Sequence, residues 1–193
     1  MELTLDALVN LVHRYYPAGI EEYDPRYQTS EEAQRLKALL ETHVGGIPAW
    51  NAFVQRLREE FVTCSIWDMT VPRHDPGYIV RVSLPGFVSS APLQEGVVCL
   101  LSKLAPVYAL YASHLKENGP GLPRDHWIRF PPFPPEFQAH EARLAEFIES
   151  TFAFVRLPEE VLLTPVPDLV PWTGKHGLGQ ARLMDLLFTE YPG

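Results

Sequence analysis

The spacing of apolar residues changes from a helical to a strand-like pattern near Val62, and this change constrains the fold more than any other feature of the sequence. Before it, apolar side chains recur every three or four residues in the segment 4–16 and in the segment that follows the capping box of Thr29 and Glu32. The same spacing returns in the segment 48–61, which opens on a proline. We therefore expect three amphipathic helices grouped at the start of the chain.

The segments that follow have the composition and spacing of β-strands. Residues 61–70 are rich in strand formers, and the turn sequence HDPG at 74–77 precedes the alternating segment YIVRVSL at 78–84. This pattern predicts an antiparallel hairpin with one covered face. Residues 96–104 are apolar at consecutive positions, as in an inner strand covered on both faces. Residues 106–115 either pair with that strand or continue it, and the strand order stays open.

The last third of the chain adds one long helix and a tail. Residues 125–130 fit a short strand, and a helical pattern begins at Pro134 and Pro135 and ends before Pro158. In the proline-rich tail, ARLMDLLF at 181–188 fits a short helix or an edge strand. Because no helices connect successive strands, a doubly wound fold is disfavoured. We predict one α+β domain over residues 1–193, with N-terminal helices, a central antiparallel β-sheet, one long helix packed on it and an irregular Pro-rich C-terminal part.

Charge restricts the class of partner. The formal net charge is −8, which repels a phosphate backbone or an anionic membrane and attracts a basic protein. The first residues carry Glu2 and Asp6 where a secretory signal carries Lys or Arg, and no apolar run is long enough to span a membrane. We expect a cytoplasmic protein that binds neither nucleic acid directly nor a membrane. Cys64 and Cys99 are then reduced core thiols, with a bridge between neighbouring strands as the alternative.

The sequence carries no recognisable catalytic or metal-binding motif. No two histidines have the i, i+4 spacing of a helical metal site, and no G-x-S-x-G segment marks a nucleophile. We therefore predict no catalytic residue, no metal and no cofactor. The alternative is a small metal-dependent hydrolase, in which Asp68, His74 and Asp75 converge at the hairpin turn. Turn-forming side chains explain HDPG more simply.

The connector between the first two predicted helices, YYPAGIEEYDPRYQTSEE at 15–32, is unusually rich in tyrosine and carboxylates. Turn and cap chemistry explains part of it, and on the plainest interpretation the whole segment is a connector. The other residues fit a contact surface, because tyrosine is enriched at interfaces and carboxylates steer a basic partner. We predict a partner-binding surface made of Glu21, Glu22, Tyr23, Asp24 and Tyr27.

Four segments carry a resemblance to a known group of proteins, namely Tyr15–Pro17, Asp24–Leu36, Leu100–Tyr111 and Met184–Phe188. In their order they resemble α+β immunity proteins of bacterial polymorphic toxin systems, especially those paired with nuclease toxins. The resemblance implies a cytoplasmic protein without catalysis that occludes a toxin's active site or substrate path. An acidic binder suits a nuclease, whose surface is basic where it holds phosphate. A non-catalytic scaffold module in a larger assembly is the remaining alternative.

Overall fold

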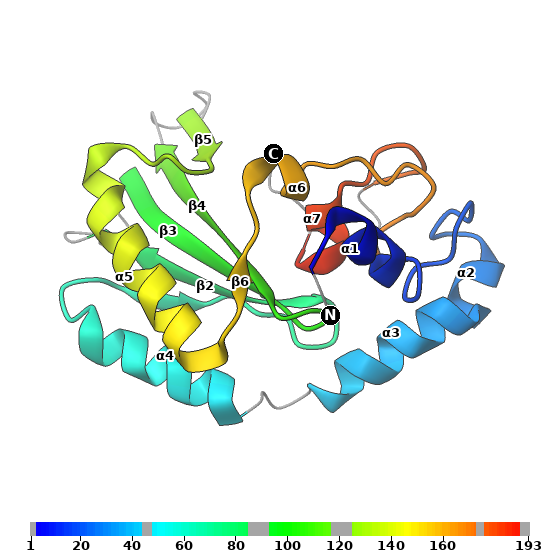
Figure 1. The fold of residues 1–193 in the computed structure, drawn as a ribbon, viewed down its shortest axis with the longest axis horizontal. Coiled ribbons are helices and arrows are strands. Elements are labelled where there is room, and N and C mark those ends of the chain that lie inside the picture. The colour runs from blue at the N-terminus through cyan, green and yellow to red at the C-terminus, as the bar shows by residue number, and fades with distance from the viewer. Residues whose placement is uncertain (1–2, 44–47, 85–92, 117–124, 173–175, 190–193) are drawn as a thin grey trace.

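A central antiparallel sheet organises the protein (Figure 1). The computed structural model describes residues 3–43, 48–84, 93–116, 125–172 and 176–189. Five strands follow the order β1-β2-β3-β4-β5, and β6 pairs in parallel with β4. Their bounds are β1 (Ile66–Asp68), β2 (Gly77–Ser83), β3 (Leu93–Ser102), β4 (Val107–Lys116), β5 (Asp125–Arg129) and β6 (Val155–Arg156). The predicted α+β class is confirmed.

The helices form two groups around this sheet. They are α1 (Leu5–Val12), α2 (Pro25–Thr29), α3 (Glu31–Thr42), α4 (Pro48–Glu60), α5 (Pro135–Phe152), α6 (Glu159–Leu162) and α7 (Leu183–Leu187). In Figure 1, α4 and the long helix α5 lie together on one side, while the N-terminal helix α1 and the C-terminal helices α6 and α7 gather on the other. The two ends of the chain therefore build one helical layer together.

The first layer packs α4 and α5 on one face of the sheet. The apolar stripe of α4 contributes Trp50, Phe53 and Leu57, all buried against β2 and β3. Helix α5 opens on Pro135, which lacks the backbone N–H that the first helical turn leaves without a partner, and it buries Phe137 and Leu144. Helix α4 forms where the helical spacing predicts it, whereas α5 ends at Phe152, earlier than predicted, and Val155–Arg156 form strand β6.

The second layer covers the opposite face, and it changes one sequence-based expectation. Leu8 of α1 and Leu36 of α3 pack with Ile79 and Leu100 on this side of the sheet. The hairpin strand β2, predicted to have one covered face, is therefore buried on both faces along most of its length. The prediction was wrong because local alternation does not reveal a helical layer assembled from distant segments. The segment 106–115 pairs with β3 rather than continuing it.

The connector is more helical than its composition indicates. Asp24 caps the short helix α2, and its side chain accepts a hydrogen bond from the backbone N–H of Arg26 at 2.9 Å. The next helix begins one residue later than predicted, because Ser30 rather than Thr29 caps it and accepts from the N–H of Ala33 at 3.1 Å. The Thr29 hydroxyl instead bonds carbonyls of α2.

The tail from α6 onward belongs to the core. Every residue from Leu183 to Phe188 is buried, so ARLMDLLF contains a short buried helix and is not an edge strand. Tyr16 donates its phenol hydrogen to the carbonyl of Leu186 at 2.9 Å, which fixes the start of the chain to its end. At Gly77 an added Cβ would lie 2.9 Å from the Cα of Phe188, so the close approach of tail and sheet requires glycine.

Both cysteines are free thiols, as expected. Cys99 is fully buried in β3, whereas Cys64 is only partly buried and its sulfur lies 3.5 Å from Nε2 of His140. Among the described residues, no helix combines the length and the apolar character that a membrane crossing requires.

Candidate functional site

The structure uses much of the predicted connector surface for internal contacts. The carboxylate of Glu21 accepts a hydrogen bond from the backbone N–H of Leu178 at 3.1 Å, which joins the connector to the tail. Asp24 forms an ion pair with Arg26 at 2.6 Å in addition to capping α2. Tyr23, by contrast, is 84% exposed. The connector thus presents an exposed ring beside carboxylates that already have partners in the fold.

Tyr27 is buried and is not part of the predicted contact surface. It is 0% exposed, and its phenol oxygen donates to the carbonyl of Val170 at 2.7 Å. Burial is the main reason that its pKa lies well above the ordinary value for tyrosine. The assignment of Tyr27 as a partner contact is corrected by this burial, and the residue is a core residue that holds the Pro-rich tail. The contact role of Glu21, Glu22, Tyr23 and Asp24 stays a prediction.

Asp68 and Asp75 of the hydrolase alternative have separate structural tasks, and His74 lies in the turn, where its backbone N–H donates to the carbonyl of Val71 at 3.0 Å. Asp68 accepts hydrogen bonds from Trp50 Nε1 at 2.9 Å and from the Thr70 N–H at 3.1 Å. Asp75 is buried and accepts from the Val71 N–H at 2.7 Å, closing the turn that precedes β2. In the parts of the chain that the structure describes, no group of three or more His, Cys, Asp or Glu side chains is arranged to hold a metal ion.

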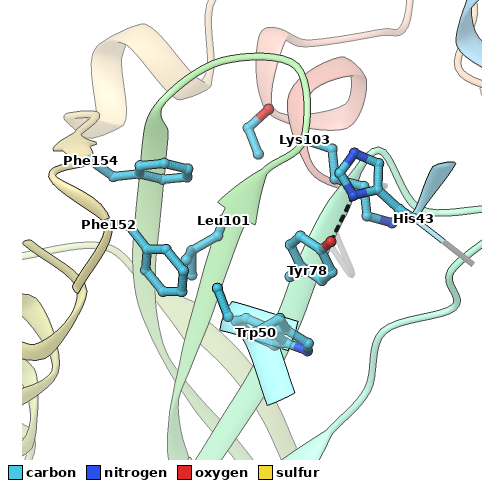
Figure 2. A pocket seen from close by; sticks show the side chains of 9 residues that line it. His43, Trp50, Tyr78, Leu101, Lys103, Phe152 and Phe154 are labelled. Carbon is cyan, nitrogen blue, oxygen red and sulfur yellow. Dashed lines mark hydrogen bonds between the residues drawn. The ribbon is translucent and has the colours of Figure 1, made fainter. Parts of the chain in front are cut away.

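An aromatic cavity lies between α4, the end of the sheet and the segment that follows α5 (Figure 2). Its volume is about 280 Å³, close to the lower end of the ~300–1,000 Å³ typical of ligand pockets. Figure 2 shows Phe152 and Phe154 on one side of it and His43 with Lys103 on the other. The lining is His43, Ala49, Trp50, Tyr78, Leu101, Ser102, Lys103, Phe152 and Phe154. We call this site the aromatic cavity.

Two stacked rings form the base of the aromatic cavity. Trp50 at the start of α4 stacks on Tyr78 of β2 with ring centroids 4.8 Å apart, and its Nε1 donates to Asp68. The phenol oxygen of Tyr78 lies 2.8 Å from Nδ1 of His43. Burial and the nearby charge of Lys103 both lower the pKa of His43. These contacts hold the rings in place and favour a neutral imidazole at physiological pH.

Lys103 closes one side of the aromatic cavity. Its Nζ donates to the carbonyls of Asp75 at 2.7 Å and Pro72 at 3.3 Å, and it lies 4.9 Å from the ring centroid of Tyr78. Burial lowers the pKa of Lys103 from 10.5 to about 8, although the carboxylates of Asp75 and Asp68 oppose this change. The amine therefore stays mostly protonated at pH 7 and ties the β1–β2 connection to the cavity.

Next to the aromatic cavity, strand β1 forms an edge of the sheet with exposed apolar side chains. Trp67 is 46% exposed, Met69 is 51% exposed and Val71 is 49% exposed. We call these three residues the apolar edge. Edge strands with exposed apolar groups are sites where another chain can pair, because their outer backbone groups have no ladder partner.

The backbone pattern shows which groups face outward from β1. Ser65 and Met69 exchange hydrogen bonds with β2, at 2.9 and 2.8 Å. Because hydrogen-bonded pairs alternate in an antiparallel ladder, the N–H and C=O groups of Ile66 and Asp68 point away from β2. Side chains also alternate, so Trp67 and Met69 lie on the face opposite Asp68 and Trp50. A strand added here would contact both faces of the sheet edge.

The sequence contained only part of the signal for this site. Residues 61–70 were predicted to form a strand, but nothing local marks that strand as the sheet edge, which depends on the pairing order. The rings of the cavity follow helical spacing in α4 and alternation in β2, and each pattern alone predicts ordinary core.

Comparison of the chain with protein-family models, with curated proteins and with solved structures finds no match.

Proposed function

We propose that this chain is an immunity protein, a small acidic binding protein that neutralises a basic toxin of the nuclease type by covering its active site or substrate path. The observation that carries the proposal concerns edge strand β1: Asp68 accepts a hydrogen bond from Trp50 of the aromatic cavity, and the opposite face of the same edge carries Trp67 and Met69 of the apolar edge. Together they offer a strand edge and a socket, which is the geometry that protein partners use.

The size of the aromatic cavity favours a side chain as its occupant. At about 280 Å³ it suits one aromatic or aliphatic group better than a drug-sized molecule. Trp50 and Tyr78 are buried and stacked, so the socket is in place before binding and little entropy is lost on forming it. In this proposal the partner places one apolar side chain in the cavity and aligns backbone with β1.

Charge favours a basic partner. The net charge of −8 attracts a cationic surface over distances of about a Debye length, ~8–10 Å at physiological salt. Exposed carboxylates accompany both candidate regions, Asp68 on β1 and Glu21 on the connector. The connector then acts on the rate of encounter, whereas the apolar edge and the cavity hold the complex together.

The test is binding of the purified protein to the toxin encoded beside its gene, measured by surface plasmon resonance together with inhibition of the toxin. Met69→Asp should weaken binding about tenfold or more, mainly through faster dissociation, because it places a charge in the apolar edge. The matched control is Val155→Asp. Val155 is also 51% exposed but lies on β6, beside β4, and its substitution should leave binding unchanged.

A second pair of substitutions tests the connector. Glu21→Lys combined with Glu22→Lys should slow association more than it speeds dissociation, and this effect should shrink at high salt. Unchanged kinetics would remove the connector from the interface. If the wild-type chain neither binds nor inhibits the neighbouring toxin, the immunity function is wrong.

A further inference from the structure

The face of the sheet opposite the aromatic cavity carries a polar cluster that the proposed function does not use. Ser83 of β2, Gly96 of β3 and Ser113 of β4 are direct cross-strand neighbours. Their side chains therefore lie in one row on one face, with glycine in the middle. Arg81 stands two residues before Ser83 and so points to the same face.

Arg81 occupies the space that the glycine leaves open. A Cβ added at Gly96 would lie 3.1 Å from Nε of Arg81, so the guanidinium stem crosses the row at this point. The same added atom would lie 2.7 Å from the carbonyl oxygen of Val82, so no larger residue fits without a shift of the backbone. The guanidinium is thus placed between the strands that carry the two serines.

The donors of this cluster are buried and lack an acceptor. Among the residues that the structure describes, Nε and Nη2 of Arg81 are shielded from solvent and have no hydrogen-bond partner, and the same holds for the hydroxyl oxygens of Ser83 and Ser113. The two serines are 0% and 8% exposed. A buried polar group without a partner costs about 1–3 kcal/mol, and more if it is charged, so several such groups in one place require an explanation.

The unused atoms of Arg81 belong to one edge of the guanidinium. Nε–H and Nη2–H point in the same direction, and together they match the two oxygens of a carboxylate or of a phosphate. Burial lowers the pKa of Arg81 from its ordinary value, but an arginine side chain keeps its charge in proteins. By contrast, Nη1 of the partly buried Arg156 pairs with the carboxylate of Glu141 at 2.8 Å, so that its charge has a counterion although its Nη2 is also buried without a hydrogen-bond partner among the described residues.

We propose that Arg81, Ser83 and Ser113 form a binding site for one small oxyanion, a carboxylate or an inorganic phosphate or sulfate. The Nε/Nη2 edge holds two oxygens of the anion, and the serine hydroxyls donate from the neighbouring strands. Gly96 leaves the space in which the guanidinium lies. The site is distinct from the aromatic cavity, which lies on the other face of the sheet, whereas Trp67 of the apolar edge is the direct cross-strand neighbour of Arg81.

The experiment is an anion titration of the full-length chain. Sodium acetate, phosphate and sulfate are each exchanged against sodium chloride at constant ionic strength, and the thermal midpoint is followed. A ligand that binds only the native state raises this midpoint in a saturable way. We expect a saturable rise with at least one oxyanion, and the ranking of the three identifies the preferred group.

Arg81→Met should weaken the apparent anion affinity about tenfold or more, since it removes charge-assisted hydrogen bonds. Arg156→Met is the matched control, because that arginine is already paired; it should lower the midpoint without changing the anion-dependent rise. The Arg81 Nε–H resonance supplies a readout in the wild-type chain, and it should shift during the titration. No saturable rise and no shift would mean that only buried water completes the cluster, and the proposal would be wrong.

Discussion

The connector and the aromatic cavity differ in what they do with their aromatic rings. In the connector, Tyr27 is buried and bonded to the tail, while Tyr23 lies 84% exposed. In the cavity, Trp50 and Tyr78 are as buried as core residues, yet their faces line an empty volume of about 280 Å³. The difference teaches that richness in tyrosine does not by itself mark a contact surface. The arrangement of aromatic rings around a cavity is a more informative sign of a contact surface.

The two regions also differ in what their charges stabilise. Glu21 and Asp24 bond a backbone N–H and Arg26, so their carboxylates contribute to the fold of the connector. At the cavity, Lys103 is held by backbone carbonyls and lies against a ring. The connector thus joins the N-terminal helices to the C-terminal tail, whereas the cavity is preformed and lies beside the edge strand β1.

The largest expected effect separates two tyrosines of the connector, Tyr27 and Tyr23. Tyr27→Ala should lower the free energy of unfolding by about 3–5 kcal/mol, because it leaves a cavity and removes the donor for the Val170 carbonyl. Tyr23→Ala should change it by no more than about 0.5 kcal/mol. Urea denaturation of both variants measures the contrast. Equal effects would mean that the connector is not divided into core and surface as described.

A smaller effect concerns Lys103, whose pKa is lowered to about 8 in the cavity. Between pH 8 and its ordinary pKa of 10.5, the unfolded chain binds this proton and the native chain has released it, so stability should rise with pH. The Lys103→Met variant lacks the ionisable group and should not show this rise. We expect the rise in the free energy of unfolding to be at most about 1 kcal/mol, because solvent screens the partly exposed amine.

The measurement for Lys103 is the difference between urea midpoints at pH 8 and pH 10 in wild type and variant. The window ends near pH 10 because the buried tyrosines, Tyr16 and Tyr27 among them, begin to oppose folding above it. If both proteins show the same pH dependence, the amine is as well solvated as a surface lysine.

The smallest effect concerns His13, the residue that caps the C-terminal end of α1 and contacts the tail. Nε2 of His13 lies 2.9 Å from the carboxylate of Asp168, and Nδ1 lies 2.8 Å from the Val9 carbonyl. Burial lowers the pKa of His13, but the bonds to Val9 and Asp168 together outweigh it, and the pKa is raised from 6.5. This stabilisation is complete below pH 6.5 and is lost as pH rises through the raised value.

A double-mutant cycle with His13→Gln and Asp168→Asn should give a coupling of about 0.2–1 kcal/mol at pH 5.5, since both side chains are partly exposed. At pH 8 the coupling should be close to zero. A coupling that is the same at both pH values would show that the contact is a neutral hydrogen bond.

Local pattern predicted most of the secondary structure for a clear physical reason. Helices α1, α4 and α5 have apolar stripes at helical spacing, and the consecutive apolar residues of β3 reflect burial on two faces. The same pattern misled at β2. Arg81 and Ser83 alternate with Val80 and Val82, which predicts a solvated polar face, yet Ser83 is fully buried. Alternation records polarity and not the packing of distant segments.

The amino-acid sequence by itself determined the type and order of most of the longer elements and the sign of the protein's charge, because these depend on neighbours a few positions apart and on composition. Only the tertiary structure decided which faces are covered, where the sheet ends and which rings enclose a cavity. Those properties depend on contacts such as that of Tyr27 with Val170, 143 positions away, and no local spacing encodes them.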